Sequence, residues 1–149
     1  MNGVVDMDQF LAFWAWSIVV GNSDGYPYTA NDVFIYGDPS DAGRYDFAPW
    51  GMDEAWAAMS WQYASCELGS RCLADEACAA RLDTALVTAL DTWDTMDVAG
   101  WAQDGFALTA DIVKTDPASP YSASQIDAGR EALLERLETW PKQLRGQLE

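Results

Sequence analysis

The chain has 149 residues, half of them hydrophobic, and a formal net charge of −16 that comes from 24 acidic and 8 basic residues. A length of this order is typical of one domain, and the apolar content is enough for a buried core. So acidic a chain argues against nucleic acid or an anionic membrane as a direct partner, because both bind through basic surfaces. The acidity favours cation binding, although a salt-adapted or simply acidic surface would explain it too.

The chain contains no histidine. Histidine is the commonest general base and zinc ligand of proteins, so a general base within this chain would have to be a carboxylate. No apolar run approaches the ~20 residues of a membrane span, and we expect none. Met1 to Gly3 carries no basic residue, so no signal peptide is visible. A start this close to a helix would suit a fragment as well as a native start.

The first half of the chain predicts a helix followed by a small hairpin. In chain order we expect a helix over about 7–20, a loop over 22–30, a strand over 33–36, a turn over 37–43 and a returning strand over 44–48. Asp6 or Asp8 can cap the helix, and Gly21 can end it. Pro49 closes the second strand, since it has no N–H to donate.

The second half predicts a helical scaffold. In chain order we expect a short broken helix over 55–66, a long helix over about 76–96, a helix over about 98–114, a linker over 116–120 and a final helix that starts near 122. Asp75 can cap the long helix, Ser122 and Gln125 have the spacing of a capping box, and Pro141 would kink or divide the final helix. The expected core positions are Leu82, Leu86, Leu90, Trp93, Leu134, Leu137, Trp140 and Leu144. The predicted fold class is therefore α+β and mostly helical, as one domain over residues 1–149.

Three cysteines, Cys66, Cys72 and Cys78, lie close together in the chain. A disulfide between Cys72 and Cys78 would span a turn into a helix start and would imply an oxidising compartment. Three buried thiols in a cytoplasmic protein are the other interpretation, and the odd third cysteine keeps it open. A metal site is disfavoured, because without histidine the fourth ligand would have to be a carboxylate.

Three polar residues have the order that a phosphoryl-transfer site requires. Such a site needs a carboxylate that orients the attacking hydroxyl, and amide and carboxylate groups that hold metal and phosphates. Asp24 follows the first helix, Asn31 comes at the mouth of the first strand, and Asp53 follows the second strand. A tight hairpin would bring Asn31 and Asp53 to the same end. The other interpretation is that Asp24 and Asn31 stabilise turns and that Asp53 caps a helix.

The same stretch carries a more specific pattern. Its parts are Gly21-Asn22-Ser23-Asp24, then Asn31-Asp32-Val33-Phe34-Ile35-Tyr36, Gly37-Asp38-Pro39 and Pro49-Trp50-Gly51-Met52-Asp53. In these parts the chain resembles the spore-coat protein H (CotH) kinase family, which has an atypical protein-kinase-like fold. The similarity covers most of the chain, including a helical tail with a cysteine pair, and is most specific over residues 21–56.

The resemblance implies an ATP-dependent kinase that phosphorylates serine or threonine residues of a protein substrate, with Mg²⁺ or Mn²⁺. By carry-over, Asp24 matches the catalytic aspartate, and Asn31 and Asp53 match metal-binding positions. Asn22 and Trp50 fall at positions expected to bind the cofactor.

Two departures from the family pattern matter. Gly51 stands where the family has the first aspartate of its Pro-Trp-Asp-x-Asp motif, and loss of a metal-binding carboxylate would cost most of the activity. Asp53 would substitute only if the backbone allows it. Both lysines, Lys114 and Lys142, lie far downstream. The chain therefore resembles the carboxy-terminal lobe alone, and we expect the amino-terminal lobe with its ATP-contacting lysine to be missing from it.

Two functions follow. The leading hypothesis is the catalytic half of a CotH-like protein kinase, inactive alone and completed by an amino-terminal lobe. The alternative is a non-catalytic, pseudokinase-type binding or structural module of a cell-envelope protein, and a cation-binding acidic module is a third option. The expected location is extracytoplasmic, secreted or in the cell envelope, with a cytoplasmic location as the alternative.

Overall fold

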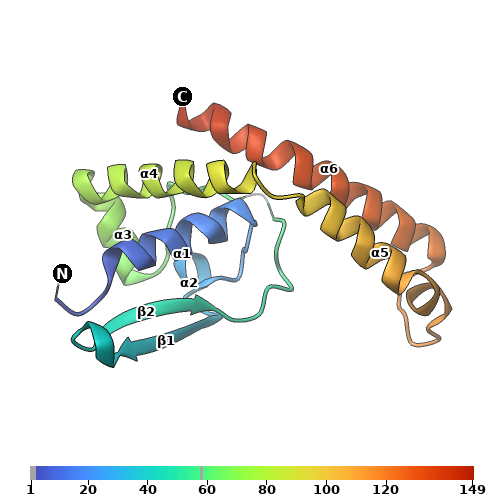
Figure 1. The fold of residues 1–149 in the computed structure, drawn as a ribbon, viewed down its shortest axis with the longest axis horizontal. Coiled ribbons are helices and arrows are strands. Elements are labelled where there is room, and N and C mark those ends of the chain that lie inside the picture. Colours follow the sequence, from blue (N-terminus) through green and yellow to red (C-terminus); the bar gives the residue numbers. More distant parts are fainter. Residues whose placement is uncertain (1–2, 58) are drawn as a thin grey trace. The chain divides into compact units, whose positions relative to one another are not determined.

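The computed structural model describes residues 3–57 and 59–149, so Met1, Asn2 and Ala58 lie outside the described residues. The described part is mostly helical and contains a two-stranded antiparallel hairpin (Figure 1), which confirms the predicted fold class. In chain order the elements are α1 (Met7–Val19), α2 (Tyr26–Thr29), β1 (Val33–Asp38), the 3₁₀ helix η1 (Pro39–Asp41), β2 (Arg44–Pro49), α3 (Glu67–Ala74), α4 (Glu76–Trp93), α5 (Val98–Thr115) and α6 (Ala123–Leu148).

The chain divides into two compact units, Met1–Leu90 and Asp91–Glu149, with the division near the end of α4. The single domain expected over residues 1–149 stays a prediction. All the candidate site residues lie in the first unit. Among the described residues, no helix combines the length and the hydropathy that crossing a membrane requires.

Helix α1 forms the centre of the first unit. The carboxylate of Asp6 caps it by accepting hydrogen bonds of 3.0 Å from the backbone N–H groups of Asp8 and Gln9. Of the two expected caps Asp6 is therefore the one used, while Asp8 forms an ion pair with Arg81 of α4. Side chains on nearly all sides of α1 are buried, as expected for a helix enclosed by other elements. These buried side chains are Met7, Phe10, Leu11, Phe13, Trp14, Ala15, Ser17, Ile18 and Val19.

The hairpin has the predicted antiparallel pairing. Val33 pairs with Pro49 at its open end and Asp38 with Arg44 next to the turn, so β1 extends two residues and β2 one residue beyond the predicted strands. Pro49 is tolerated because it is the last residue of β2, where no further ladder bond from its nitrogen is needed.

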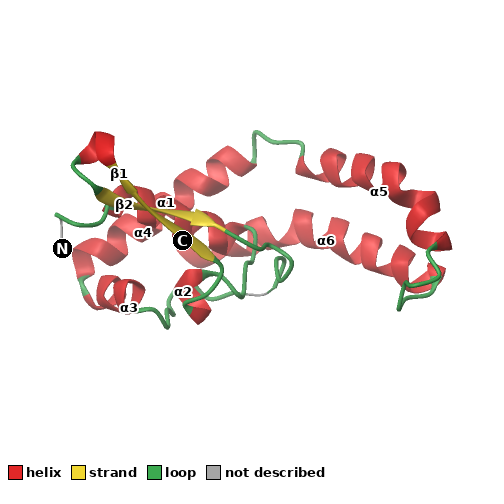
Figure 2. Ribbon diagram, turned by 90° about the horizontal axis from the view of Figure 1, so that it is seen from below, coloured by secondary structure: helices red, strands yellow, loops and turns green. Residues whose placement is uncertain are grey.

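Strand β2 packs on α1, and the hairpin lies on the side of α1 away from α4 (Figures 1 and 2). The side chain of Gln9 binds the backbone of Phe47 at both its N–H and its C=O, which completes the hydrogen bonding of this position in the strand. The Phe47 ring lies 5.0 Å from that of Phe10, centroid to centroid. The hairpin is therefore fixed to the helix that precedes the candidate site.

The structure differs from the sequence prediction at residues 22–30, where the single-turn helix α2 replaces part of the expected loop. Pro27 lies in its first turn. A helix does not need the N–H of such a residue, so proline starts the helix instead of breaking it.

The helix predicted over 55–66 is wrong. The described residues there form turns and irregular backbone, Ala58 lies outside the described residues, and the next helix begins only at Glu67. The N–H groups of Trp56 and Ala57 donate to carbonyl groups at the end of α1, at 2.8 and 2.9 Å. Trp56 has a φ of +71°, outside the helical region, so the backbone cannot form a helix through this position.

The long helix α4 has the predicted start. The Asp75 carboxylate accepts a hydrogen bond of 2.8 Å from the Cys78 backbone N–H, so Asp75 is the cap. The predicted stripe of Leu82, Leu86 and Leu90 is buried. Helix α3, which precedes this cap, was not predicted; its short length of 8 residues leaves little periodicity to detect.

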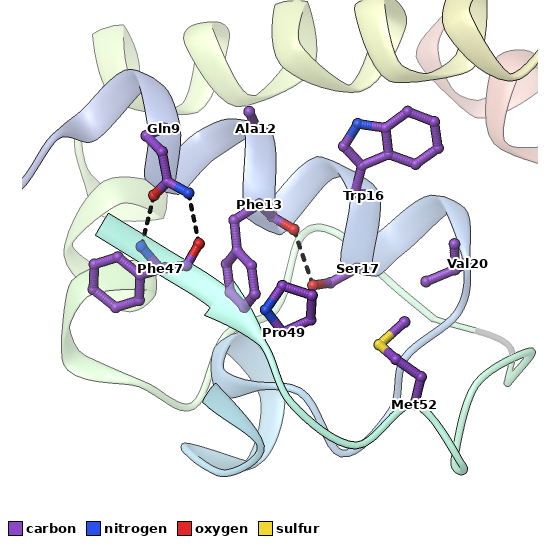
Figure 3. A pocket seen from close by; sticks show the side chains of 9 residues that line it. All are labelled: Gln9, Ala12, Phe13, Trp16, Ser17, Val20, Phe47, Pro49 and Met52. Carbon is purple, nitrogen blue, oxygen red and sulfur yellow. Dashed lines mark hydrogen bonds between the residues drawn. The ribbon is translucent and has the colours of Figure 1, made fainter. Parts of the chain in front are cut away.

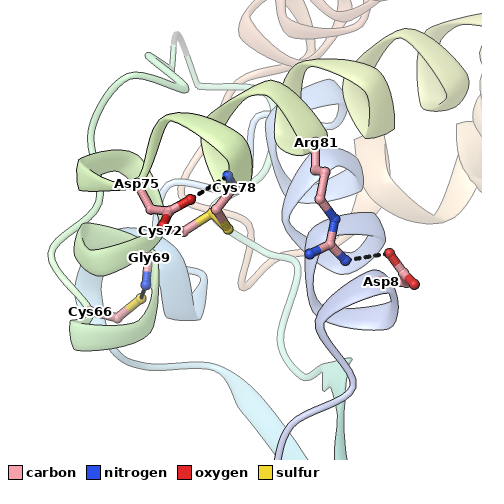
Figure 4. Close-up of a disulfide and its surroundings, with 7 residues drawn as sticks. All are labelled: Asp8, Cys66, Gly69, Cys72, Asp75, Cys78 and Arg81. Atoms are coloured by element: carbon pink, nitrogen blue, oxygen red, sulfur yellow. Dashed lines mark hydrogen bonds and ion pairs between the residues drawn. A yellow bond between two sulfur atoms is a disulfide. The ribbon is translucent and has the colours of Figure 1, made fainter. Parts of the chain in front are cut away.

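A disulfide joins Cys72 of α3 to Cys78 of α4, as predicted, with 5.1 Å between their Cα atoms (Figure 4). Cys66 is a buried free thiol that accepts a hydrogen bond from the Gly69 N–H at 3.2 Å. Its burial raises the pKa of the thiol. The alternative of three buried thiols is therefore wrong for Cys72 and Cys78, and only Cys66 is a thiol.

The second unit contains α5 and α6, which contact each other. The predicted capping box of Ser122 and Gln125 is present and starts α6. The helix continues through Pro141 to Leu148, so it is not divided there. Of the predicted core positions of α6, Leu137, Trp140 and Leu144 are buried and Leu134 is half-buried.

Candidate functional site

The end of α1 is bonded to the segment that follows the hairpin. Gly21 has a φ of +62°, and its carbonyl accepts a hydrogen bond of 2.9 Å from the N–H of Ala57. A Cβ atom on Gly21 would overlap the Ala57 carbonyl oxygen. Glycine is therefore required here both for its backbone conformation and for the close approach of the two segments.

A second connection lies closer to the candidate site residues. Both the N–H and the hydroxyl of Ser23 donate to the carbonyl of Glu54, at 3.3 and 3.1 Å. Ser23 precedes Asp24, and Glu54 follows Asp53. The loop after α1 and the loop after β2 therefore hold Asp24 and Asp53 in a common region.

Asp24 and Asn31 are joined directly by their side chains, a contact that the sequence did not predict. The side-chain N–H of Asn31 donates a hydrogen bond of 3.2 Å to the Asp24 carboxylate. The chain between them turns through α2 and then through Ala30, whose φ of +57° ends this helix. The Thr29 hydroxyl fixes the same loop by donating to the Asp24 backbone carbonyl at 2.7 Å.

Asp32 is a further member of the site that sequence reasoning missed. Partial burial, and then the charges of Asp24 and Asp53, raise the pKa of Asp32. Asp32 is therefore close enough to each of these two carboxylates for their charges to act on it. The signal in the sequence was its place beside Asn31, directly before the first strand.

Gly51 lies between two of these carboxylates. It has a φ of +63°, and a Cβ atom there would lie 3.0 Å from an Asp32 carboxylate oxygen and 3.5 Å from one of Asp53. Because Gly51 has no side chain, a space that faces Asp32 and Asp53 is left at this position.

The two predicted cofactor-binding residues have different surroundings. Asn22 is fully buried; its side-chain nitrogen donates to the Met52 sulfur at 3.4 Å, and its side-chain oxygen has no hydrogen-bond partner among the described residues. Trp50 is 58% exposed, and its ring meets that of Phe34 edge-on at 5.5 Å. An exposed indole can stack on a planar ligand, whereas the buried side chain of Asn22 contacts the Met52 side chain instead of solvent. Cofactor binding by either residue stays a prediction.

The donors of the site suit a hard divalent cation. They are carboxylate and amide oxygens, the ligands of Mg²⁺, and the site contains no sulfur or imidazole donor. Within residues 3–57 and 59–149, no group of three or more His, Cys, Asp or Glu side chains is arranged to hold a metal ion. A cation bound by one or two carboxylates, with water or substrate phosphates as its other ligands, needs no such group, so the residues fit a weakly held Mg²⁺ or Mn²⁺ that nucleotide phosphates would bind more tightly.

An apolar cavity of about 340 Å³ lies between α1 and the hairpin (Figure 3). Its lining residues are Gln9, Ala12, Phe13, Trp16, Ser17, Val20, Phe47, Pro49 and Met52. Met52 connects this cavity to the site, because it also contacts Asn22 and precedes Asp53.

The model of the CotH kinase protein family matches residues 1–92. The chain belongs to the CotH kinase family. The match contains every candidate site residue and ends within α4, close to the division between the two units. No individual curated protein was found to match the chain. Family membership confirms the resemblance, and it applies to the unit in which the aspartates converge.

Proposed function

We propose that this CotH-family chain provides the phosphoryl-transfer residues of an ATP-dependent protein kinase that modifies serine or threonine. The observation that carries the proposal is the contact of Asp24 with Asn31 beside Asp53, at the base of a hairpin fixed to α1. Asp24 and Asn31 are hydrogen bonded, and the bonds from Ser23 to Glu54 hold the loop that carries Asp53 beside the loop that carries Asp24.

Asp24 takes the role of the base that orients the attacking hydroxyl. The hydrogen bond from Asn31 and the Thr29 bond to its backbone restrict both the loop and the carboxylate. A restricted carboxylate can accept a hydroxyl proton without first losing side-chain freedom.

Asn31 and Asp53 take the role of metal ligands. Asn31 uses its N–H on Asp24, which leaves the amide oxygen as a donor to a cation. Asp53 is exposed, so its carboxylate is accessible to a metal–nucleotide complex. When bound, Mg²⁺ or Mn²⁺ would neutralise charge on the transferred phosphoryl group. Trp50 offers an exposed ring for the nucleotide base, and Asn22 would act indirectly, through its hydrogen bond to Met52, which precedes Asp53.

The family-matched segment offers no free basic side chain for the ATP phosphates among its described residues. Residues 1–92 contain no lysine, and their three arginines are Arg44, Arg71 and Arg81. Each of these arginines forms an ion pair with a carboxylate of its own unit. We therefore expect the 149-residue chain by itself to transfer no phosphate, and we expect activity only when an amino-terminal lobe supplies the phosphate-contacting lysine.

The disulfide supports an extracytoplasmic location, because such bonds persist in oxidising compartments. A secreted or cell-envelope enzyme would act on a protein substrate in the same compartment.

The test is transfer of labelled γ-phosphate from ATP, with Mg²⁺ or Mn²⁺, to a serine-rich protein such as casein. The chain is assayed alone and joined to the amino-terminal lobe of a CotH-family relative. We expect transfer only by the joined protein, and a loss of at least about 100-fold in Asp24→Asn. Asp104→Asn, an exposed change on α5 with the same chemistry, is the matched control.

Asp24→Asn with undiminished transfer would contradict the role of Asp24. Absence of transfer in every form of the protein, together with tight binding of another protein, would favour the alternative of a non-catalytic module. Gly51 is the observation that favours that alternative, since it removes a carboxylate from the motif.

A further inference from the structure

The space beside Gly51 is bordered by the carboxylate of Asp32, the residue that directly precedes β1. A Cβ atom on residue 51 would point at an Asp32 carboxylate oxygen only 3.0 Å away, so the position that a side chain at 51 would use is next to Asp32. The Asp32 carboxylate therefore lies next to the position where a carboxylate of residue 51 would lie if that residue were aspartate.

The backbone explains why Asp32 lies there. The Trp50 N–H donates to the Asp32 carbonyl at 3.1 Å, which continues the hairpin ladder one step beyond Val33 and Pro49. Asp32 has a φ of +48°, a conformation that aspartate tolerates better than most residues do. Its position is thus set by strand pairing and not by a flexible loop.

Two like charges border this space. Carboxylate oxygens of Asp32 and Asp53 lie 3.0 and 3.5 Å from the position of a Cβ atom on residue 51, in a chain that already carries a net charge of −16. The arginine and lysine ion pairs that the structure describes have other acidic partners, so none of these pairs neutralises Asp32 or Asp53.

A second observation concerns Asn22. This side chain lies between the two loops of the site: its nitrogen contacts the sulfur of Met52, and it would lie 2.9 Å from a Cβ atom on Gly25. Its side-chain oxygen is buried and has no partner among the described residues. A buried polar atom of this kind indicates a water or ion that the protein chain does not itself supply.

We propose that Asp32 provides the second metal-binding carboxylate of this site, together with Asp53, in place of the side chain that Gly51 lacks. This inference rests on the proposed function, which assigns metal binding to Asn31 and Asp53. Asp24 remains with Asn31 as the hydroxyl-orienting group. Two carboxylates and an amide oxygen are the protein ligands that a Mg²⁺ or Mn²⁺ bound to nucleotide phosphates requires.

The test measures binding of Mn²⁺ alone to the full chain by electron paramagnetic resonance, which needs no catalytic activity. We expect Asp32→Asn to weaken Mn²⁺ binding at least about tenfold, as loss of a ligand should, and Asp53→Asn to do the same. Glu54→Gln removes an equal charge beside the site, and Asp104→Asn removes one on α5. Both controls should change the affinity by less than about threefold, because a general charge effect is spread over many carboxylates.

The outcomes separate the two proposals. Mn²⁺ binding that is weakened by Asp53→Asn and unchanged by Asp32→Asn overturns the role of Asp32 and leaves the proposed function standing. Binding that neither substitution changes overturns both metal assignments. A loss in Glu54→Gln as large as in Asp32→Asn also overturns the inference, because charge alone would then explain it.

Discussion

The side chain of Asn31 donates a 3.2 Å hydrogen bond to the carboxylate of Asp24, seven residues earlier in the chain. The intervening helix α2 and the positive φ of Ala30 reverse the chain direction and bring the two together. The Asn31 side chain thereby joins the loop after α1 to the beginning of the hairpin. Substitutions of Asn31 should therefore change both the stability of the fold and the geometry of the site.

Replacement of Asn31 by aspartate should destabilise the metal-free fold more than replacement by alanine. Asn31→Ala loses one hydrogen bond, at a cost of about 1 kcal/mol. Asn31→Asp loses the same bond and places another carboxylate against Asp24 and Asp32. Urea unfolding at neutral pH would measure the difference, and the excess loss in Asn31→Asp should shrink when salt or Mn²⁺ is added. Equal stability of the two variants would mean that the carboxylates do not interact.

Gly51→Asp, which restores the usual motif residue, should destabilise this chain when made alone. Its positive φ disfavours a side chain, and the new Cβ atom would lie 3.0 Å from the Asp32 carboxylate. In Asp32→Asn/Gly51→Asp the charge count at the site is that of the natural chain. We expect the double variant to bind Mn²⁺ more tightly than Asp32→Asn, and to unfold at a higher temperature than Gly51→Asp.

The two substitutions should thus be non-additive, since the residues share one space. Additive effects on the unfolding temperature and on Mn²⁺ affinity would show that residues 32 and 51 act independently.

Local patterns in the sequence predicted most of the elements. Alternation identified the hairpin, and capping residues such as Asp75 and Ser122 identified where α4 and α6 begin. These signals depend on residues close together in the chain, so they can be read without the fold. The hydrogen bond between Asp24 and Asn31 was not predicted, because it depends on the turn of the chain through α2 and Ala30.

Tertiary hydrogen bonds explain what the sequence did not reveal. Trp56 and Ala57 bond to the end of α1 instead of forming a helix, and no local pattern indicates this. The place of Asp32 depends on the register of the hairpin, which sets it across from Trp50. Its position beside Gly51 depends on how the two segments at the open end of the hairpin pair, so neither segment predicts it alone.

Gly21→Ala and Gly43→Ala form a matched pair that separates backbone strain from steric overlap. Both glycines have a positive φ, but a Cβ atom on Gly43 has nothing within 4 Å, whereas one on Gly21 overlaps the Ala57 carbonyl. We expect Gly43→Ala to cost about 1 kcal/mol and Gly21→Ala roughly 3 kcal/mol in the free energy of unfolding, measured in urea.

Gly21→Ala should also weaken Mn²⁺ binding, because the displaced segment carries Asp53, and Gly43→Ala should not. Equal costs in stability would show that the contact between residues 21 and 57 is easily rearranged.

Reduction of the Cys72–Cys78 disulfide should lower the stability of the chain by about 2 kcal/mol, since the bond closes a loop of six residues in the unfolded chain. Thermal unfolding with and without a phosphine reductant measures this effect, and Cys72→Ala/Cys78→Ala is the control that should not respond to the reductant.

Thiol titration checks the pairing separately. Cys66 is buried with a raised pKa, so it should react slowly in the native protein and as one thiol after denaturation without reductant. Denaturation with a reductant should release all three cysteines as reactive thiols. Three reactive thiols without the reductant would contradict the disulfide.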